Sequence, residues 1–398
     1  MTNLPQGWEV KKLEEIANIK GGKRLPKGEN LLDNNTKFAY IRVADFQDNG
    51  TINLQNIKFI YENTYNVLKN YKIYDDNLYI SIAGTIGKSG IIPKELNGAI
   101  LTENAVKLEY IQNNISNKFM YFFTLSNIFK TQIQTSTKIV AQPKLAITRL
   151  KQIQIPLPPL KEQERIVGIL DESFAKIDES IKILEQDLLN LDELMQSALQ
   201  KAFNPLKDNA KENYKLPQSW EWKSLEEISE NISAGGDKPK NCTESKTAKN
   251  QIPVYANGVN NNGLVGYTDK ATIIKPSLTI SARGTIGFVC IRKEPYFPIV
   301  RLISLIPCEN ILCLHYLYFC LNFFIAKGEG SSIPQLTIPK FKSLQIPLPP
   351  LKEQEQIAEH LDFVFEKAKA LKELYTKELK DYEELKQSLL DKAFKGEL

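Results

Sequence analysis

The feature that most constrains the fold is a string of ten residues that occurs twice. Ile-Pro-Leu-Pro-Pro-Leu-Lys-Glu-Gln-Glu occupies residues 155–164 and returns at 346–355. The prolines at 156, 158 and 159 enforce an extended entry and allow a helix only after them. Glu162 and Glu164 then place negative charge in the first turn, where the helix dipole favours it. Each copy therefore predicts the start of a helix.

A long amphipathic helix is predicted after each copy, over 160–203 and 351–394, 44 residues each. The first ends before Pro205 and the second just before Gly396, and both residue types are typical of a helix end. Apolar residues recur at steps of three or four along both segments. They are Ile166, Leu170, Phe174, Ile177, Ile181, Leu184, Leu188, Leu191 and Met195, then Leu361, Val364, Ala368, Leu371, Tyr375, Tyr382, Leu385 and Leu389.

One apolar stripe on each helix needs a partner, and the other copy is the complementary surface of equal length. If the segment between the helices is compact with neighbouring ends, the two helices pair antiparallel within one chain. A coiled coil between two copies of the chain is the alternative. The equal lengths favour the pairing within the chain.

The segments before the two helices repeat as well. Leu-Pro-Gln-Gly-Trp-Glu-Val at 4–10 is answered by Leu-Pro-Gln-Ser-Trp-Glu-Trp at 216–222, and Gly-Thr-Ile-Gly occurs at 84–87 and 284–287. The chain is a tandem duplication whose loops have diverged. We expect a globular domain at 1–154, a helix at 155–204, a second domain at 205–345 and a second helix at 346–398.

Each globular segment mixes short β-rich runs with an apolar helical stretch, which predicts an α+β domain. We expect strands at residues 38–43, 77–84 and 277–284, and helices at residues 117–130 and 314–326. The fold class is therefore α+β, with two globular domains separated by two long helices packed as an antiparallel coiled coil. This arrangement is a tandem repeat with pseudo-two-fold symmetry.

Composition is that of an ordinary soluble chain, with 42% hydrophobic and 25% charged residues and a net charge of +4. This charge permits nucleic acid as a partner without requiring it. The N-terminus has no apolar leader and no apolar run reaches membrane-spanning length, so we expect a cytoplasmic protein. Five cysteines, all in the second half, are predicted to be reduced core thiols. A metal site made of Cys308, Cys313, His315 and Cys320 is disfavoured by its spacing.

Catalytic motifs are not evident. Gly-Thr-Ile-Gly-Lys-Ser at 84–89 places its glycines two residues too close for a phosphate loop, and its counterpart at 284–289 has no lysine. A structural pair of glycines in a strand–turn–strand unit is the favoured interpretation. Two histidines, His315 and His360, leave little material for acid–base chemistry. We find no adenine-methyltransferase motif, so a binding subunit is favoured over an enzyme.

The duplicated Pro-Leu-Pro-Pro-Leu-Lys-Glu-Gln string, its equal long helices and the Gly-Thr-Ile-Gly repeats resemble the specificity subunit of type I DNA restriction–modification systems. The resemblance covers nearly the whole chain. It implies two target-recognition domains on a helical spacer. It also implies double-stranded DNA, two modification subunits that methylate adenine, and restriction subunits as partners. S-adenosylmethionine, ATP and Mg are then expected in those partners, and none in this chain.

Such a chain would read a split, asymmetric site, each domain contacting one half and the helices setting the gap between them. The candidate DNA contacts are basic or polar residues near the repeated segments, and for each of them a solvated surface side chain is the alternative. In domain one they are Lys23, Arg24, Lys27, Arg42, Lys88, Lys138 and Lys144; in domain two they are Lys238, Lys240, Arg283, Lys327 and Gln335. The alternative functions are a coiled-coil scaffold that binds proteins and a fused restriction enzyme.

Overall fold

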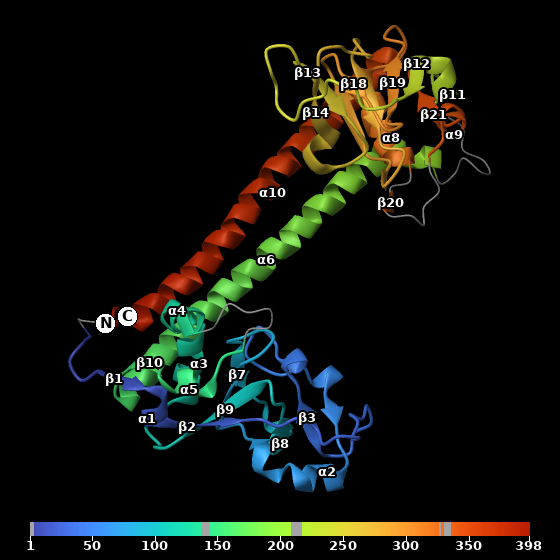
Figure 1. The fold of residues 1–398 in the computed structure, drawn as a ribbon. Coiled ribbons are helices and arrows are strands. Elements are labelled where there is room, and N and C mark those ends of the chain that lie inside the picture. The colour runs from blue at the N-terminus through green and yellow to red at the C-terminus, as the bar shows by residue number, and fades with distance from the viewer. Residues whose placement is uncertain (1–3, 137–143, 208–216, 326–327, 330–335) are drawn as a thin grey trace. The chain divides into compact units, whose positions relative to one another are not determined.

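The computed structural model describes residues 4–136, 144–207, 217–325, 328–329 and 336–398. The chain forms two compact units (Figure 1). The first unit comprises 1–184 and 377–398, and the second comprises 185–376. Each unit contains one globular domain and a part of each long helix, and the two units are described separately below.

The first domain is built from two four-stranded sheets and a small two-stranded one. The first four-stranded sheet is antiparallel with the order β2-β9-β6-β7, the second is mixed with the order β4-β3-β8-β5, and β1 pairs with β10. The strands are β1 (Glu9–Lys12), β2 (Ala17–Gly21), β3 (Ala39–Ile41), β4 (Lys58–Phe59), β5 (Lys72–Ile73), β6 (Leu78–Ser81), β7 (Ser89–Ile91), β8 (Ala99–Leu101), β9 (Ala105–Tyr110) and β10 (Gln154–Leu157). The helices are α1 (Leu13–Ile16), α2 (Glu62–Val67), α3 (Asn117–Leu125), α4 (Asn127–Ser136) and α5 (Ile147–Lys151).

Strand β6 is buried along its length because both of its faces are covered. Leu78 and Ile80 join the core that includes α3, whereas Tyr79 between them joins the core of the second sheet. Successive side chains of a strand point to opposite faces, so this alternation is what a buried central strand requires. The predicted helical stretch at 117–130 is confirmed, although it is divided into α3 and α4 at Ser126.

The second domain repeats this plan. Its antiparallel sheet has the order β12-β19-β15-β17, a three-stranded sheet has the order β14-β13-β18, β11 pairs with β21, and β16 pairs with β20. The strands are β11 (Glu221–Ser224), β12 (Ser229–Ala234), β13 (Ile252–Tyr255), β14 (Leu264–Thr268), β15 (Ser277–Ile280), β16 (Thr285–Ile286), β17 (Val289–Arg292), β18 (Phe297–Pro298), β19 (Ile303–Pro307), β20 (Gly328–Glu329) and β21 (Gln345–Leu348). The helices are α7 (Leu225–Ile228), α8 (Leu314–Phe324) and α9 (Ile338–Lys342).

The two Gly-Thr-Ile-Gly segments form equivalent turns. The first connects β6 to β7 and the second lies between β15 and β17, and both strand pairs are antiparallel. Gly84, Gly87, Gly284 and Gly287 all have φ between 70° and 88°, a range that favours glycine. The predicted strand–turn–strand role of these glycines is confirmed.

The long helices are α6 (Leu160–Lys207) and α10 (Leu351–Ala393), and both begin at the predicted residue. Their ends differ from the prediction. Helix α6 continues past Pro205 to 48 residues, although this proline lacks the N–H donor that the helix would otherwise use there. Helix α10 has 43 residues and ends one residue early, with Gly396 in the left-handed conformation at φ 74°.

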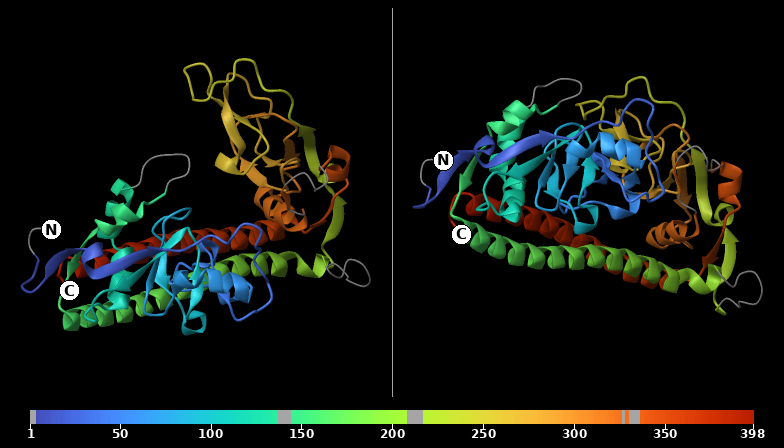
Figure 2. Two further views of the ribbon diagram at one scale, coloured as in Figure 1. Left: turned by 60° about the horizontal axis from the view of Figure 1, so that its bottom comes forward. Right: turned by 90° about the horizontal axis from the view of Figure 1, so that it is seen from below.

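Parts of the two helices run side by side in each unit (Figure 1, Figure 2). In the first unit Lys386 of α10 forms an ion pair with Asp178 of α6, and in the second unit Lys372 pairs with Asp192. Within the first unit, Leu170 shares a core with Phe394, whereas the later Asp178 meets the earlier Lys386. Within the second, Asp192 meets Lys372 and the later Phe203 shares a core with the earlier Leu361, so the packing is antiparallel in both units, as predicted. The apolar stripes join the domain cores: Ile166 and Leu170 with Phe394, and Phe203 with Leu361.

The cysteines are free thiols, of which Cys320 is buried and the other four are partly buried. Burial raises the pKa of the Cys320 and Cys290 thiols. Within the described ranges no three or more His, Cys, Asp or Glu side chains are grouped to hold a metal ion. None of the described helices combines the length and the apolar character needed to cross a membrane.

Candidate nucleic-acid interface

Sheet register brings several loops of the first domain to one end of its sheets. Strand β2 ends at Gly21 opposite Val106, near the start of β9, and β6 ends at Ser81 opposite Ala105. Strand β3 ends beside the end of β8, and the Thr102 N–H donates to the carbonyl of Ile41 at 3.0 Å. The loops that follow β2, β3, β6 and β8 therefore leave from the same end. We call residues 22–24, 42–45, 82–88 and 102–104 the loop end of the first domain.

Four candidate residues lie on this loop end. Lys23 is exposed, and its ammonium is 5.9 Å from the centre of the Tyr71 ring. Arg24 donates from Nε to Glu103 at 2.7 Å, with 79% of its side chain exposed. Burial has the largest single effect and would raise the pKa of Glu103. The hydrogen bonds from Arg24, the backbone and Thr102, together with the charge of Arg24, outweigh it and hold the pKa below its ordinary value. Arg24 is therefore an exposed cation held in an ion pair with Glu103.

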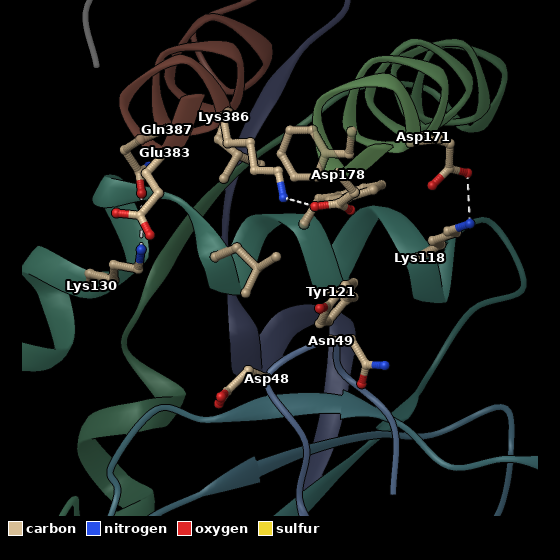
Figure 3. Close-up of a pocket in the computed structure, with 15 residues that line it drawn as sticks. Asp48, Asn49, Lys118, Tyr121, Lys130, Asp171, Asp178, Glu383, Lys386 and Gln387 are labelled. Carbon is tan, nitrogen blue, oxygen red and sulfur yellow. Dashed lines mark hydrogen bonds and ion pairs between the residues drawn. The ribbon is translucent and has the colours of Figure 1, made fainter. Parts of the chain in front are cut away.

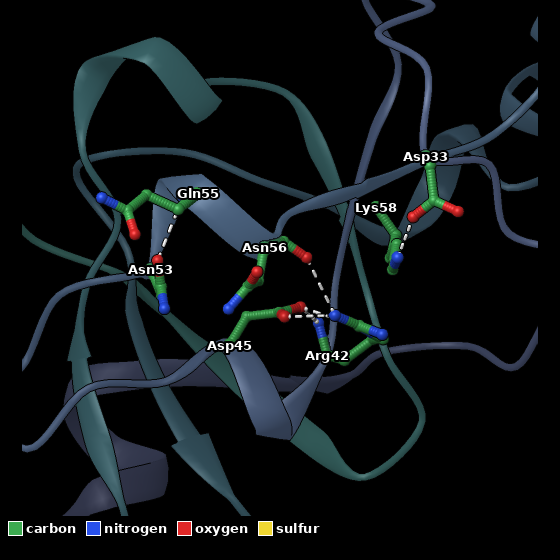
Figure 4. Close-up of polar contacts among 7 residues, drawn as sticks. All are labelled: Asp33, Arg42, Asp45, Asn53, Gln55, Asn56 and Lys58. Atoms are coloured by element: carbon green, nitrogen blue, oxygen red, sulfur yellow. Dashed lines mark hydrogen bonds and ion pairs between the residues drawn. The ribbon is translucent and has the colours of Figure 1, made fainter.

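Arg42 is the most firmly held of the candidates (Figure 4). Its guanidinium donates to both carboxylate oxygens of Asp45, at 2.6 and 3.1 Å, and to the carbonyl of Asn56 at 3.0 Å. Asp45 is 1% exposed, so its carboxylate oxygens take their hydrogen bonds from Arg42. The hydrogen bond to Asp45 raises the pKa of Arg42. Arg42 therefore orders its loop, whether or not it also contacts a ligand.

The remaining candidates of the first domain differ in their surroundings. Lys88 follows the Gly-Thr-Ile-Gly turn and forms an ion pair with Asp48 at 2.7 Å. Lys144 is exposed and its backbone bridges to Ala83 beside the same turn. Lys27 is exposed in the segment after β2, where the sheet register does not place it at the loop end. Lys138 lies outside the described residues.

The second domain has an equivalent loop end. Strands β12 and β15 end at Ala234 and Ile280, both opposite Ile303 at the start of β19. Strand β13 ends opposite Pro298, at the end of β18. We call 235–240, 256–263, 281–288 and 299–302 the loop end of the second domain. It carries the exposed candidates Lys238, Lys240 and Arg283. Lys327 and Gln335 lie outside the described residues.

Sequence reasoning missed the glutamine inside each copy of the repeated string. The Gln163 Oε1 accepts the Ser116 N–H at 2.9 Å, and its Nε2 donates to the carbonyls of Asn114 and Pro158 at 3.1 and 2.9 Å. Ser116 is the N-cap of α3, so the glutamine joins the domain's apolar helix to the start of α6. Gln163 is 1% exposed. The glutamine recurs in both copies of the repeated string, between charged residues that lie nearer the surface. This recurrence was the sequence signal that could have identified it.

Gln354 makes the same contacts in the second unit. Its Oε1 accepts the N–H of Cys313, the N-cap of α8, at 2.9 Å, and its Nε2 donates to the carbonyls of Ile311 and Pro349, each at 2.8 Å. A second duplicated contact lies eight residues, or about two turns, further along each helix. Asp171 pairs with Lys118, and Asp362 pairs with His315, both at 2.6 Å. The repeated string thus anchors each domain to its helix.

A groove of about 900 Å³ lies in the first unit between α3, α6 and α10 (Figure 3). Lys118 and Lys386, which line it, are paired with Asp171 and Asp178, and Lys130 donates to Gln387 at 2.9 Å. Each of these lysines points toward its partner, and aromatic side chains also line the groove. Four carboxylates, Asp48, Asp171, Asp178 and Glu383, also line this groove, so it is a weaker candidate for a phosphate backbone than the loop ends.

Comparisons with known proteins agree with this geometry. The model of the family described as "Type I restriction modification DNA specificity domain" matches residues 5–188 and 217–380. The putative type I specificity subunit S.MpnORF507P of Mycoplasma pneumoniae is 29% identical over 357 residues, 88% of this chain and 87% of that protein. The EcoBI specificity subunit of Escherichia coli is 29% identical over 205 residues, 50% of this chain and 42% of that protein.

Two solved structures share the fold. A chain from a study of assembly and conformational transition of the type I R-M system gives a TM-score of 0.81 at 20% identity, with 100% of both chains covered. The HsdS subunit from Thermoanaerobacter tengcongensis gives 0.64 at 21% identity, covering 100% of this chain and 98% of that one. Because the family model matches both halves of the chain, the protein belongs to the family of type I restriction modification DNA specificity domains.

Proposed function

We propose that this chain is the DNA-recognition subunit of a type I restriction–modification complex. Each domain reads one half of a split site in double-stranded DNA, and the paired helices set the gap between the halves. The observation that carries this proposal is the duplicated loop end. Equivalent strands of the two domains end at the same end of their sheets, and the loops that follow them carry basic residues in both domains.

The two loop ends differ in sequence, so the half-sites should differ as well. Residues 22–24 of the first domain are Gly-Lys-Arg, whereas the equivalent loop of the second continues as Gly-Gly-Asp-Lys from Gly235. Lysine and arginine there would neutralise phosphates and supply most of the salt-dependent affinity, while a few side chains at base edges would supply specificity.

The chemistry would be performed by partners. The chain would direct two modification subunits, which hold S-adenosylmethionine and methylate adenine after extracting it from the stack. It would also direct restriction subunits that use ATP and Mg. This chain would act without a cofactor of its own. The paired helices and the anchoring glutamines would hold each domain at a fixed place on the spacer.

Selection from a random duplex library by the assembled complex tests this function. Two short constant blocks separated by an unread gap of fixed length are expected among the selected sequences. The affinity for a selected duplex should fall linearly with salt on a double-logarithmic plot. Selection without any enriched block, by a complex that contains the partner subunits, would instead support a scaffold that binds proteins.

A further inference from the structure

The loop end of the second domain contains a turn with an unusual backbone. The Leu302 N–H donates to the carbonyl of Ile299 at 3.1 Å, and the two residues between them, Val300 and Arg301, have φ of 54° and 60°. This is the left-handed pattern that asparagine and glycine normally occupy, because a β-branched side chain there is strained. Strain of this kind persists where the surroundings impose it, and it concentrates at functional sites.

Two neighbouring loops hold this turn in place, and a third holds the Asn257 side chain that contacts it. The Val300 N–H donates to the carbonyl of Gly236 at 2.8 Å, and the Arg301 N–H donates to that of Gly235 at 2.9 Å. A side chain at Gly235 would place its Cβ 2.6 Å from the Ile299 nitrogen, so the loops meet at a glycine. Asn257 donates to the Val300 carbonyl at 2.7 Å and accepts the Ala282 N–H at 2.8 Å. The turn is therefore positioned from several sides.

The equivalent turn of the first domain is ordinary. There the Ala105 N–H donates to the carbonyl of Thr102 at 3.2 Å, and the intervening Glu103 and Asn104 are not among the described residues with positive φ. Glu103 is also occupied by Arg24 at 2.7 Å. The two halves of the duplication thus share the turn but differ in its conformation and charge, at the place where two readers of different sequences should differ.

Arg301 has the properties of a group kept for an external ligand. It is exposed, and the structure gives its guanidinium no hydrogen bond or ion pair with any other described residue. Its backbone is fixed on both sides, so the base of the side chain is pre-organised. A guanidinium presents a planar fork of donors that matches the O6 and N7 acceptors of guanine in the major groove.

We infer that Arg301 is a specificity-determining residue of the second domain and reads a guanine in its half-site. This inference rests on the proposed function and adds a base and a residue to it. Arg301 was absent from the candidates drawn from the sequence, since an isolated arginine after an apolar run carries no pattern. Asn257 acts as a positioning residue, because its amide holds the carbonyl of the same turn.

The test is methylation mapping in cells that co-express the methyltransferase partner with wild-type chain, Arg301→Ala or Arg301→Lys. Lys293→Ala is the matched control, since this exposed residue follows β17 at the end of the sheet away from the loop end. We expect Arg301→Ala to lower methylation at the wild-type site and relax one guanine position in the second half-site. In binding assays the preference for that guanine should fall about 10- to 100-fold.

The first half-site should stay unchanged in every variant, and Lys293→Ala should behave as wild type. An Arg301→Ala motif identical to wild type overturns the inference. The inference is also overturned if Arg301→Ala lowers the affinity equally whichever base stands at that position and Arg301→Lys restores the affinity, because that pattern indicates a phosphate contact. If the wild-type chain itself directs no split motif, the proposed function has failed, and this outcome is distinct from a failure of Arg301.

Discussion

Replacing Gln163 with leucine should destabilise the first unit strongly, although the side chain has a similar size. Leucine keeps the buried volume but has no hydrogen-bonding atoms. The substitution therefore removes the acceptor that binds the Ser116 N–H and the two donors that bind the carbonyls of Asn114 and Pro158. At roughly 1 kcal/mol for each bond, and more where a buried partner is left unpaired, the loss is about 2–4 kcal/mol. For a unit of roughly 200 residues this corresponds to a fall in Tm of roughly 5–15 °C.

The three tryptophans allow each unit to be observed separately. Trp8 packs against the core of the first unit, whereas Trp220 and Trp222 lie in the second. With Trp220 and Trp222 replaced by phenylalanine, the fluorescence of Trp8 reports the thermal unfolding of the first unit. With Trp8→Phe, the fluorescence of Trp220 and Trp222 reports the unfolding of the second unit. Gln163→Leu should lower mainly the midpoint reported by Trp8.

Gln354→Leu is the matched variant and should lower mainly the midpoint of the second unit, because Gln354 makes the same three kinds of hydrogen bond there. Glu164→Gln and Glu355→Gln are controls, since both residues are exposed neighbours in the repeated string. Midpoints within about 1 °C of wild type for both leucine variants would refute the reasoning that these buried amides anchor the domains to their helices.

Three further predictions follow from the helices and the loop ends. Deleting one heptad from each long helix, between the two interhelical ion pairs, shortens the spacer by about 10 Å. At ~3.4 Å for each base pair, methylation mapping should show a gap that is shorter by up to about three base pairs. Both half-sites should be retained. An unchanged gap would contradict the spacer role. Arg42→Ala and Arg283→Ala should each weaken recognition of their own half-site in a duplex-binding assay, and equal losses at both halves would count against these contacts. Because Arg24 helps to lower the pKa of Glu103, the ionised carboxylate stabilises the fold above its ordinary pKa, and this contribution is lost as pH falls through the lowered value. Arg24→Gln should raise the pKa of Glu103 in an NMR titration, and an unchanged value would show that the ion pair is not formed.

Local signals explain the parts of the fold that the sequence predicts well. The prolines before residue 160 define where α6 begins, and the apolar steps of three or four identify the buried face of α6. The predicted stripe of α10 is only partly correct, because its members Leu371 and Leu385 are exposed. The two Gly-Thr-Ile-Gly segments require a positive φ at their glycines, so a turn between strands follows from residue type. In each case the deciding interaction lies within a few residues of the signal.

Features that depend on distant contacts could not be predicted. The end of α6 beyond Pro205 was misplaced, since a proline favours a helix end without requiring it. The role of Gln163 depends on Asn114 and Ser116, almost fifty residues away. The left-handed Val300 has no local sequence signal, because hydrogen bonds from two other loops hold its conformation. The loop ends emerge only when the strand register is known.

The central claim is that this chain supplies the sequence specificity of a methyltransferase. The most direct measurement is single-molecule sequencing of DNA from cells that express the partner modification subunit with and without this chain, scoring modified adenines. The account predicts a split, asymmetric motif with a gap of fixed length, present only when the chain is expressed. The absence of any motif, with the modification subunit shown to be active and bound to the chain, would contradict it.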